Sequence, residues 1–276
     1  MIEGWSNLDK DETSFPYADI CNEAVSDDKV FDKFKKDPRY IAILEHVSPE
    51  QGLKYIEGIQ QYELDQDLIE TFKENDLYGG SSRVGYDLPF GLISPSTLRY
   101  IQNALDISYF YGEGDLNRIV EIGGGYGGLC KTISCLCDFE EYHIYDIEPA
   151  SKLQEKYLSK FDITGKTIHH STINKLEDID LVVSNYAYSE LNEELQSLYY
   201  ENIIANSKKV YMILNRGQVS RQVFLDRAEK DFDINVEKVL DFWPPNGYLY
   251  YTTMTRKWKF EIQYYQSFNL LVVMKK

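Results

Sequence analysis

The sequence predicts an α/β fold, in which a seven-stranded, mostly parallel Rossmann-like sheet carries helices on both faces and follows a helical N-terminal extension. From residue 118 onward, short apolar runs alternate with helical stretches, as in a parallel sheet covered on both sides. A glycine-rich turn follows the first apolar run and opens a helix. The first 115 residues or so show helical patterns and no series of buried strands.

Each sheet element is marked by its own run of residues. The seven predicted strands span residues 118–122, 141–145, 166–169, 181–184, 210–214, 236–240 and 270–274. The predicted helices between them cover residues 128–137, 151–158, 192–205 and 219–230. An aromatic segment at about 242–265 predicts an inserted turn and hairpin near the end of the sheet.

Two helix starts are well marked in the extension. Ser48 is an N-cap hydroxyl before Pro49 and is followed by Gln51, so a helix is expected to about residue 62. Ser94-Pro95 repeats this start, with a helix expected to about residue 106. The Gly- and Ser-rich loop at about 78–91 is either a connector or a lid over a ligand. We therefore predict two regions, a 1–115 extension and a 116–276 ligand-binding domain.

The amino-acid composition limits the classes of binding partner that we expect. The chain has 29 Lys and Arg residues and 45 Asp and Glu residues, which gives a formal net charge of −16. Nucleic acid and anionic membranes are therefore poor partners. The polar, acidic start has no signal-peptide pattern, and no apolar run is long enough to span a membrane. We expect a soluble, cytoplasmic protein. The four cysteines lack zinc-site spacing and are expected to be reduced and mostly buried.

The glycine-rich turn fits two nucleotide-binding patterns. Gly123, Gly125 and Gly128 satisfy GxGxxG, which binds a dinucleotide pyrophosphate. The same segment satisfies E-x-G-x-G-x-G, the turn of S-adenosylmethionine (SAM) methyltransferases. Glu121 favours the second pattern, because its carboxylate can compensate the positive charges of SAM. Asp146, at the end of the next strand, can accept the ribose hydroxyls of either ligand.

Three blocks of the chain together resemble the sugar O-methyltransferase family. These are EIGGGYGGL at 121–129, YDIE at 145–148 and DLVVSNYAYSEL at 180–191, the last continued by Gln196, Tyr199, Tyr200 and Asn215. The resemblance covers roughly residues 80–250. It implies a class I methyltransferase fold, SAM as methyl donor with S-adenosylhomocysteine (SAH) as product, and a sugar hydroxyl as acceptor, in a glycan, a nucleotide sugar or a glycosylated metabolite.

The cofactor-binding candidates lie mostly at predicted strand ends. They are Glu121, Gly123, Gly124, Gly125, Tyr126, Asp146, Ile147, Ser171 and Asn185, with Arg83 of the loop as a clamp for the SAM carboxylate. Arg83 is equally explained as a solvated loop charge, and Asn185 as a loop cap.

Methyl transfer to a sugar hydroxyl calls for a positioned base. Glu190 is the first candidate, because it lies in the loop after the fourth strand, although a Glu there also complements a helix dipole. His170, next to His169 at the end of the third strand, is the alternative base or a packed ring. The substrate-binding candidates are Tyr86, Tyr186, Tyr188, Trp243, Asn246 and Tyr248, of which the last three also suit hairpin packing.

Several alternatives stay open. The fourth strand ends in Ser184-Asn185 without paired aspartates, so no metal is predicted. A methyltransferase with a non-sugar acceptor, an NAD-dependent oxidoreductase and a degenerate binding module are the competing functions. The extension can cap its own subunit or pair with a second copy, so a homodimer stays open.

Overall fold

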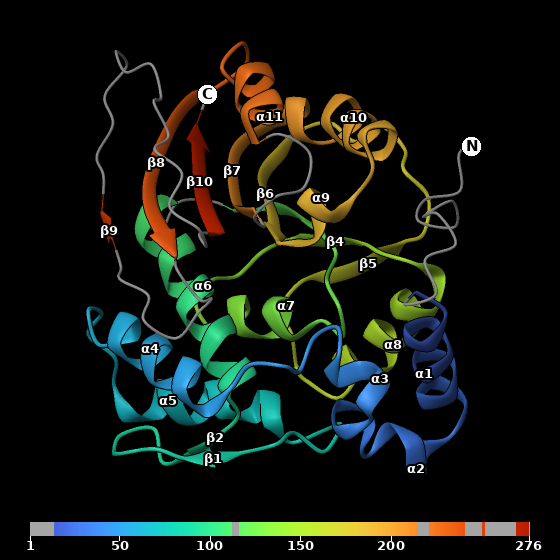
Figure 1. Ribbon diagram of the computed structural model, residues 1–276, viewed down its shortest axis with the longest axis vertical. Helices are drawn as coiled ribbons and strands as arrows, with labels where there is room; N and C mark the ends of the chain where they lie inside the picture. Colours follow the sequence, from blue (N-terminus) through green and yellow to red (C-terminus); the bar gives the residue numbers. More distant parts are fainter. Residues whose placement is uncertain (1–13, 112–115, 215–220, 241–249, 252–268, 276) are drawn as a thin grey trace.

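A computed structural model describes residues 14–111, 116–214, 221–240, 250–251 and 269–275 (Figure 1). Its centre is one eight-stranded sheet in the order β5-β4-β3-β6-β7-β10-β8-β9. The strands are β3 (Arg118–Ile122), β4 (Glu141–Tyr145), β5 (Lys166–His170), β6 (Ile179–Asn185), β7 (Ser207–Leu214), β8 (Asp233–Leu240), β9 (Tyr250–Tyr251) and β10 (Asn269–Lys275). All seven predicted strands are present at or within three residues of the expected bounds.

The strand directions correct the prediction of a seven-stranded sheet. Five neighbouring strands, β5 to β7, run parallel. Strand β10 is antiparallel to β7 and to β8, and the short β9 adds an eighth, antiparallel strand. An apolar run indicates that a strand is buried, but it does not indicate the direction of the neighbouring strand, so the number of parallel strands was not readable from sequence.

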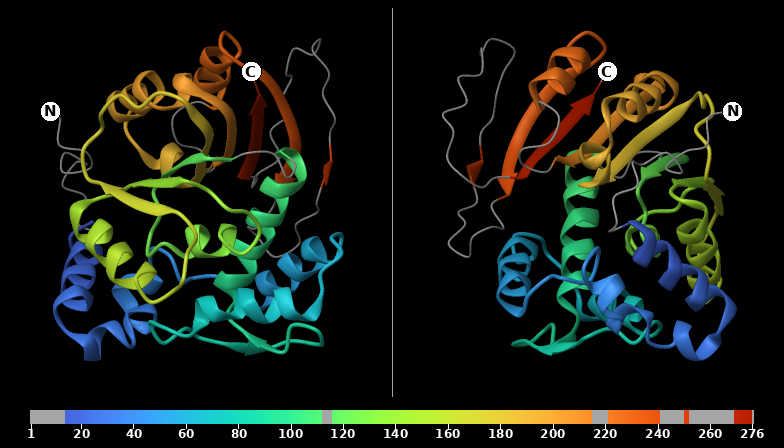
Figure 2. Two further views of the ribbon diagram at one scale, coloured as in Figure 1. Left: turned by 180° about the vertical axis from the view of Figure 1, so that it is seen from behind. Right: turned by 45° about the vertical axis from the view of Figure 1, so that its right-hand side comes forward.

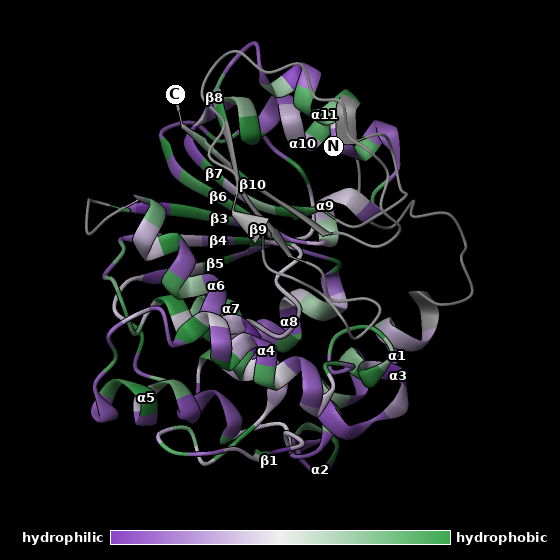
Figure 3. Cartoon of the chain, turned by 60° about the vertical axis from the view of Figure 1, so that its left-hand side comes forward, coloured by the Kyte–Doolittle hydropathy of each residue, from purple (hydrophilic) through white to green (hydrophobic). Residues whose placement is uncertain are grey.

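Side chains alternate between the two faces of the sheet. Ile119 and Val183 belong to one apolar cluster, whereas Val120 and Val182 belong to another on the opposite face. The first face is covered by α6 (Pro95–Tyr111), α7 (Gly128–Ile133) and α8 (Glu148–Leu158). The second face is covered by α9 (Ala187–Glu190), α10 (Glu193–Asn202) and α11 (Arg221–Ala228) (Figures 1 and 2). Coloured by hydropathy, the strands between these layers carry many apolar residues (Figure 3).

The extension is helical, as predicted, with one short hairpin. Its elements before α6 are α1 (Ser14–Ser26), α2 (Asp28–Phe31), the 3-10 turn η1 (Phe34–Lys36), α3 (Pro38–Ile41), α4 (Pro49–Ile59), α5 (Gln66–Lys73), η2 (Glu74–Asp76), β1 (Val84–Gly85) and β2 (Leu92–Ile93). Helix α4 begins with the predicted capping box, in which Ser48 and Gln51 bond each other's backbone N–H groups. Helix α6 continues to Tyr111, beyond the expected end. No helix in these described ranges is long and apolar enough to cross a membrane.

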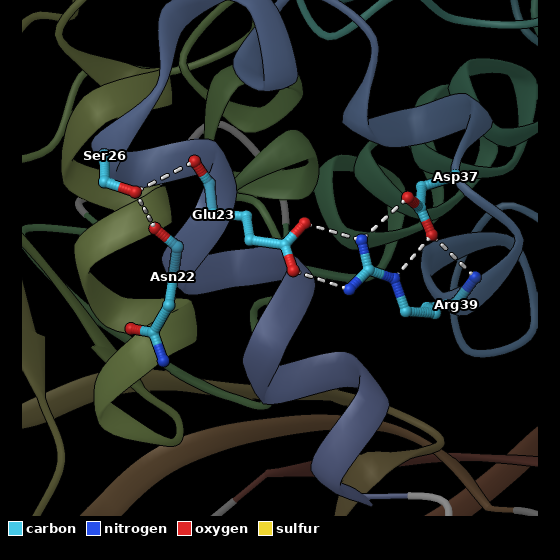
Figure 4. Close-up of polar contacts among 5 residues, drawn as sticks. All are labelled: Asn22, Glu23, Ser26, Asp37 and Arg39. Carbon is cyan, nitrogen blue, oxygen red and sulfur yellow. Dashed lines mark hydrogen bonds and ion pairs between the residues drawn. The ribbon is translucent and has the colours of Figure 1, made fainter.

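Ion pairs join parts of the extension that are distant in sequence. Arg39 of α3 donates to both carboxylate oxygens of Glu23 in α1, at 2.8 and 2.7 Å, and also to Asp37 (Figure 4). The Arg39 side chain is 33% exposed, so this pair adds little stability on its own. Its two-pronged geometry fixes how α1 lies against α3.

An aromatic cluster joins the extension to the sheet domain. Tyr126, in the glycine-rich turn, is buried with its ring against the rings of Phe34, Tyr40, Tyr100 and Tyr157. The buried Lys35 ammonium lies 4.0 Å from the Tyr126 ring centroid and donates to the Asn75 carbonyl. The extension is therefore packed directly against the turn that the sequence singled out.

Candidate functional site

The glycine-rich turn begins at the carboxyl end of β3, in the middle of the parallel strands. Gly123, Gly125 and Gly127 have positive φ angles of 79°, 58° and 93°, a conformation that favours glycine. A Cβ on Gly123 would lie 2.1 Å from the Cβ of Ala187, and one on Gly124 would lie 2.4 Å from Ile144 Cγ2. The turn is therefore built so closely against its neighbours that it leaves no room for side chains at these positions.

Two carboxyl groups lie behind the turn. Glu121 is 3% exposed and accepts a 3.0 Å hydrogen bond from the Tyr142 hydroxyl. Asp146 is 5% exposed and accepts from the Gly125 N–H at 3.0 Å and from the Ile147 N–H at 2.8 Å. Burial raises the pKa of Glu121 to about 8 and that of Asp146 to about 7. A cation placed at the turn would favour the ionised form of both groups.

A polar network extends from Asp146 to β5. The Gln154 side-chain amide donates to Asp146 at 3.1 Å and to the Gly125 carbonyl at 3.0 Å. Its oxygen lies 3.0 Å from His169 Nδ1. Gln154 therefore ties the carboxylate to the glycine turn, a role that no sequence pattern indicated.

The raised pKa of Glu121 has a measurable consequence for stability. Between about pH 4.5 and pH 8 the folded protein holds a proton that the unfolded chain releases, so this contribution to stability is lost as pH rises through that window. Glu121→Gln removes this titration. Between pH 5 and pH 9 the free energy of unfolding of the variant should therefore fall by less than that of the wild type, and the difference should be on the order of 3 kcal/mol. Urea unfolding at both pH values measures this.

The control for this measurement is Glu140→Gln, which changes an exposed carboxylate next to β4. Its pH profile should follow that of the wild type. A Glu121→Gln profile parallel to the wild type would contradict the assignment of a buried, protonated Glu121.

At the end of β6, Asn185 and Tyr186 lie beside the turn. Glu121 pairs with Val183 in register, which brings Asn185 level with Gly123. Both side-chain atoms of the Asn185 amide are buried, and neither has a hydrogen-bond partner among the described residues. Tyr186 has a φ of 72°. A buried amide without partners next to a strained residue indicates a place where a ligand completes the structure.

The extension forms the facing wall of the site. A Cβ built on Gly125 would lie 2.9 Å from Leu44 Cδ1, and the Leu44 carbonyl accepts a 3.1 Å bond from Arg99 Nη2 in α6. Arg99 interacts electrostatically with Glu45, Tyr55, Tyr100 and Tyr186. Sequence analysis missed Leu44, Glu45, Tyr55 and Arg99.

The remaining predicted cofactor residues fall at two kinds of place. Ile147 is half-buried at the N-cap of α8, and Ser171 directly follows β5, so both stay at the strand ends beside Asp146. Tyr126 contributes its backbone to the turn, but its ring is buried in the aromatic cluster, where its hydroxyl accepts from Asn75.

The loop residues Arg83 and Tyr86 are not brought to the glycine turn. Arg83 donates to the Asp76 carbonyl at 2.6 Å and lines a separate cavity of about 540 Å³ with Lys36, Gly79 and Gly80. The Tyr86 hydroxyl donates to the Pro49 carbonyl at 3.1 Å, which attaches the hairpin to α4. The loop at 78–91 packs against η1 and α4.

Two further predicted residues, Tyr188 and His170, lie on the second face of the sheet, which α9, α10 and α11 cover. Tyr188 is buried against Phe224, and its hydroxyl donates to the Gln196 carbonyl at 3.1 Å, so it is a core residue and not a binding surface. His170 stacks on Tyr145, and its Nε2 lies 2.9 Å from His143 Nδ1. Burial lowers the pKa of His170 to about 4, which makes it a weak base.

Glu190 is exposed at the end of α9. Trp243, Asn246, Tyr248 and Asn215 lie outside the described residues. Within the described ranges, no three side chains of the His, Cys, Asp and Glu types gather as metal ligands.

Comparisons with known proteins complete the description. No family model matches the chain, and no curated protein matches it. Among solved structures, protein 1320 of Thermoplasma acidophilum is similar at 14% identity, with 78% of this chain and 98% of that chain covered and a TM-score of 0.49.

Two further similar structures contain a nucleoside ligand. Magnesium protoporphyrin IX methyltransferase (ChlM) of Synechocystis, with bound SAM, has 11% identity, covers 78% and 99% of the two chains and gives a TM-score of 0.47. TrmK of M. capricolum, with bound SAH, has 13% identity, covers 64% and 67% and gives a TM-score of 0.43.

Proposed function

We propose that this protein is a SAM-dependent methyltransferase that binds SAM at the glycine turn and methylates a sugar hydroxyl. One observation carries the proposal. Three adjacent strand ends present Asp146, the turn at Gly123–Gly125 and the unpartnered Asn185 amide on one face of the sheet. The carboxyl ends of parallel strands are where nucleotide ligands bind in such sheets.

Each group has a role that follows from its chemistry. The glycines allow the backbone to approach the ligand closely. Asp146 uses Oδ2 for Gly125 and Gln154 and Oδ1 for the Ile147 N–H, and the lone pair that remains on Oδ1 accepts a ribose hydroxyl. Glu121 supplies a negative charge behind the turn when SAM, whose sulfonium is positive, is bound. The unpartnered Asn185 amide supports a role in binding the amino-acid end of SAM.

SAM supplies an electrophilic methyl group, and the protein aligns an acceptor oxygen with it and excludes water. Bound SAM would supply the methyl group to the hydroxyl oxygen, and Glu190 would accept the hydroxyl proton. Tyr186, which is half-buried at the end of β6, offers its ring to the acceptor. The sugar rests on the resemblance of the 121–129 and 180–191 blocks, and the net charge of −16 supports a small acceptor in the cytoplasm over a nucleic acid.

Calorimetry with SAM, SAH and NAD tests the donor. We expect micromolar binding of SAM and SAH and none of NAD. Asp146→Ala removes the ribose acceptor and should weaken SAH binding about 10- to 100-fold, as for loss of charge-assisted hydrogen bonds.

The matched control is Asp138→Ala, an exposed aspartate before β4, which should bind SAH as the wild type does. Binding of NAD alone would replace the methyltransferase with an oxidoreductase. Binding of none of the three would favour a degenerate binding module.

A further inference from the structure

Arg99 is a buried cation without a matching anion. Only 6% of the residue is exposed. Its Nη2 donates to the Leu44 carbonyl, and its guanidinium lies 5.4 Å from the Tyr100 ring centroid. Within the described part of the chain, no carboxylate comes within the 4.0 Å of an ion pair with Arg99. A buried guanidinium normally has such a partner, because its desolvation is otherwise uncompensated.

Arg39 provides the contrast within the same extension. It is more exposed than Arg99, yet it holds two carboxylates, those of Glu23 and Asp37 (Figure 4). A fold that pairs a half-exposed arginine twice and leaves a buried one without a carboxylate indicates that the missing anion is a ligand.

The position of Arg99 identifies where that ligand lies. Its partner Leu44 is in contact with Gly125 of the turn. Arg99 also interacts with Tyr55 and with Tyr186, which directly follows the unpartnered Asn185. The guanidinium therefore belongs to the wall of the proposed SAM site.

The carboxylate of Glu45 acts on Arg99 electrostatically. It lies beyond ion-pair distance, and its buried Oε1 has no hydrogen-bond partner in the described residues. Burial raises the pKa of Glu45, whereas the charges of Lys35 and Arg99 oppose that rise. Because the two side chains form no ion pair, Glu45 leaves the Arg99 guanidinium without a carboxylate in contact.

We propose that Arg99 binds a carboxylate of the ligand in the glycine-turn site. The inference rests on the proposed methyltransferase function. The planar guanidinium fork matches a carboxylate in a two-pronged arrangement. Two sources supply this chemistry, the α-carboxylate of SAM and an acidic group on the acceptor, such as that of a uronic acid.

The first experiment compares Arg99→Gln and Arg99→Lys with the wild type by calorimetry. The probes are SAH and 5′-methylthioadenosine, which keeps the nucleoside and the thioether but lacks the amino acid. If the donor is the source, Arg99→Gln should raise the Kd for SAH about 10- to 100-fold and leave the Kd for 5′-methylthioadenosine within about threefold. Arg99→Lys keeps the positive charge but lacks the two-pronged guanidinium. Its Kd for SAH should therefore lie between those of the wild type and Arg99→Gln.

The second experiment measures glucuronate and glucose binding in the presence of saturating SAH. If the acceptor is the source, the wild type binds glucuronate in preference to glucose, and Arg99→Gln abolishes the preference. Arg39→Gln, whose arginine has its own carboxylates, should leave all four Kd values as in the wild type.

Two results would overturn the inference. Equal weakening of SAH and 5′-methylthioadenosine by Arg99→Gln would make Arg99 a structural residue. No change in either SAH binding or glucuronate preference would leave Arg99 without a carboxylate to bind. A wild type that binds neither nucleoside is a different result, since it refutes the proposed function itself.

Discussion

Replacing Glu190 with glutamine is expected to lower kcat for sugar methylation about 100- to 1,000-fold, because a sugar hydroxyl needs a base to take its proton. Glutamine keeps the size of the side chain and cannot accept the proton. The Kd for SAH should stay within about twofold, since Glu190 acts on the acceptor and not on the donor. The rate of SAH formation with a sugar acceptor that the wild type methylates gives kcat. Calorimetry gives the Kd for SAH.

We expect Glu190 rather than His170 to be this base. His170 lies on the face of the sheet opposite Asp146 and Asn185, stacked on Tyr145. Glu190 lies at the end of α9, the helix whose Ala187 is next to Gly123 of the turn, and its side chain is exposed.

The control for the Glu190 experiment is Glu194→Gln, an exposed carboxylate in the first turn of α10. It should turn over at the wild-type rate. The low-pH limb of the kcat profile, which reports ionisation of the base, should disappear in Glu190→Gln alone. A Glu190→Gln enzyme with wild-type kcat would exclude Glu190 from the chemistry.

The predictable part of the fold was the part that local sequence encodes. The capping box at Ser48 and Gln51 depends on residues three apart, and it formed as expected. The glycine turn depends on backbone conformations that favour glycine, and Gly123 and Gly125 adopt them. Strand positions followed from apolar runs, whereas strand directions depend on which neighbour each strand meets and were not readable.

Long-range packing decided the rest of the site. Tyr188 is two residues from Tyr186, but α9 turns it into the core on the opposite face. The positions of Arg83 and Tyr86 depend on how the loop at 78–91 folds, and this loop packs on other parts of the extension.

Arg99 had a signal that was open to two interpretations. Residues 99, 102, 103 and 106 of α6 repeat at helical spacing and are polar, which normally indicates a solvent face. In the folded chain all four are buried. The polar stripe was therefore visible, but only the docking of the extension onto the sheet shows that it is buried and that Arg99 lies beside Leu44.

The close packing of the glycine turn leads to the second large expected effect, that of Gly123→Ala. A Cβ on Gly123 would lie 2.1 Å from Ala187 Cβ, and the φ of 79° is strained for alanine. Overpacking costs about 1–3 kcal/mol and the left-handed conformation about 1–2 kcal/mol. The free energy of unfolding should therefore fall by about 2–5 kcal/mol, and SAH binding should be lost because the turn must move.

The double variant Gly123→Ala with Ala187→Gly separates the two causes. Removing the Ala187 methyl relieves the overlap but leaves the backbone strain, so the pair should recover about 1–3 kcal/mol relative to the sum of the single effects. Urea unfolding of both single variants and the double variant gives this coupling. Gly85→Ala, where a Cβ would meet nothing within 4 Å, should change stability little. If the effects of the two single substitutions were additive, the turn and α9 would not be in contact. The assignment of α9 as the element that holds Asn185 and Tyr186 beside the donor would then be wrong.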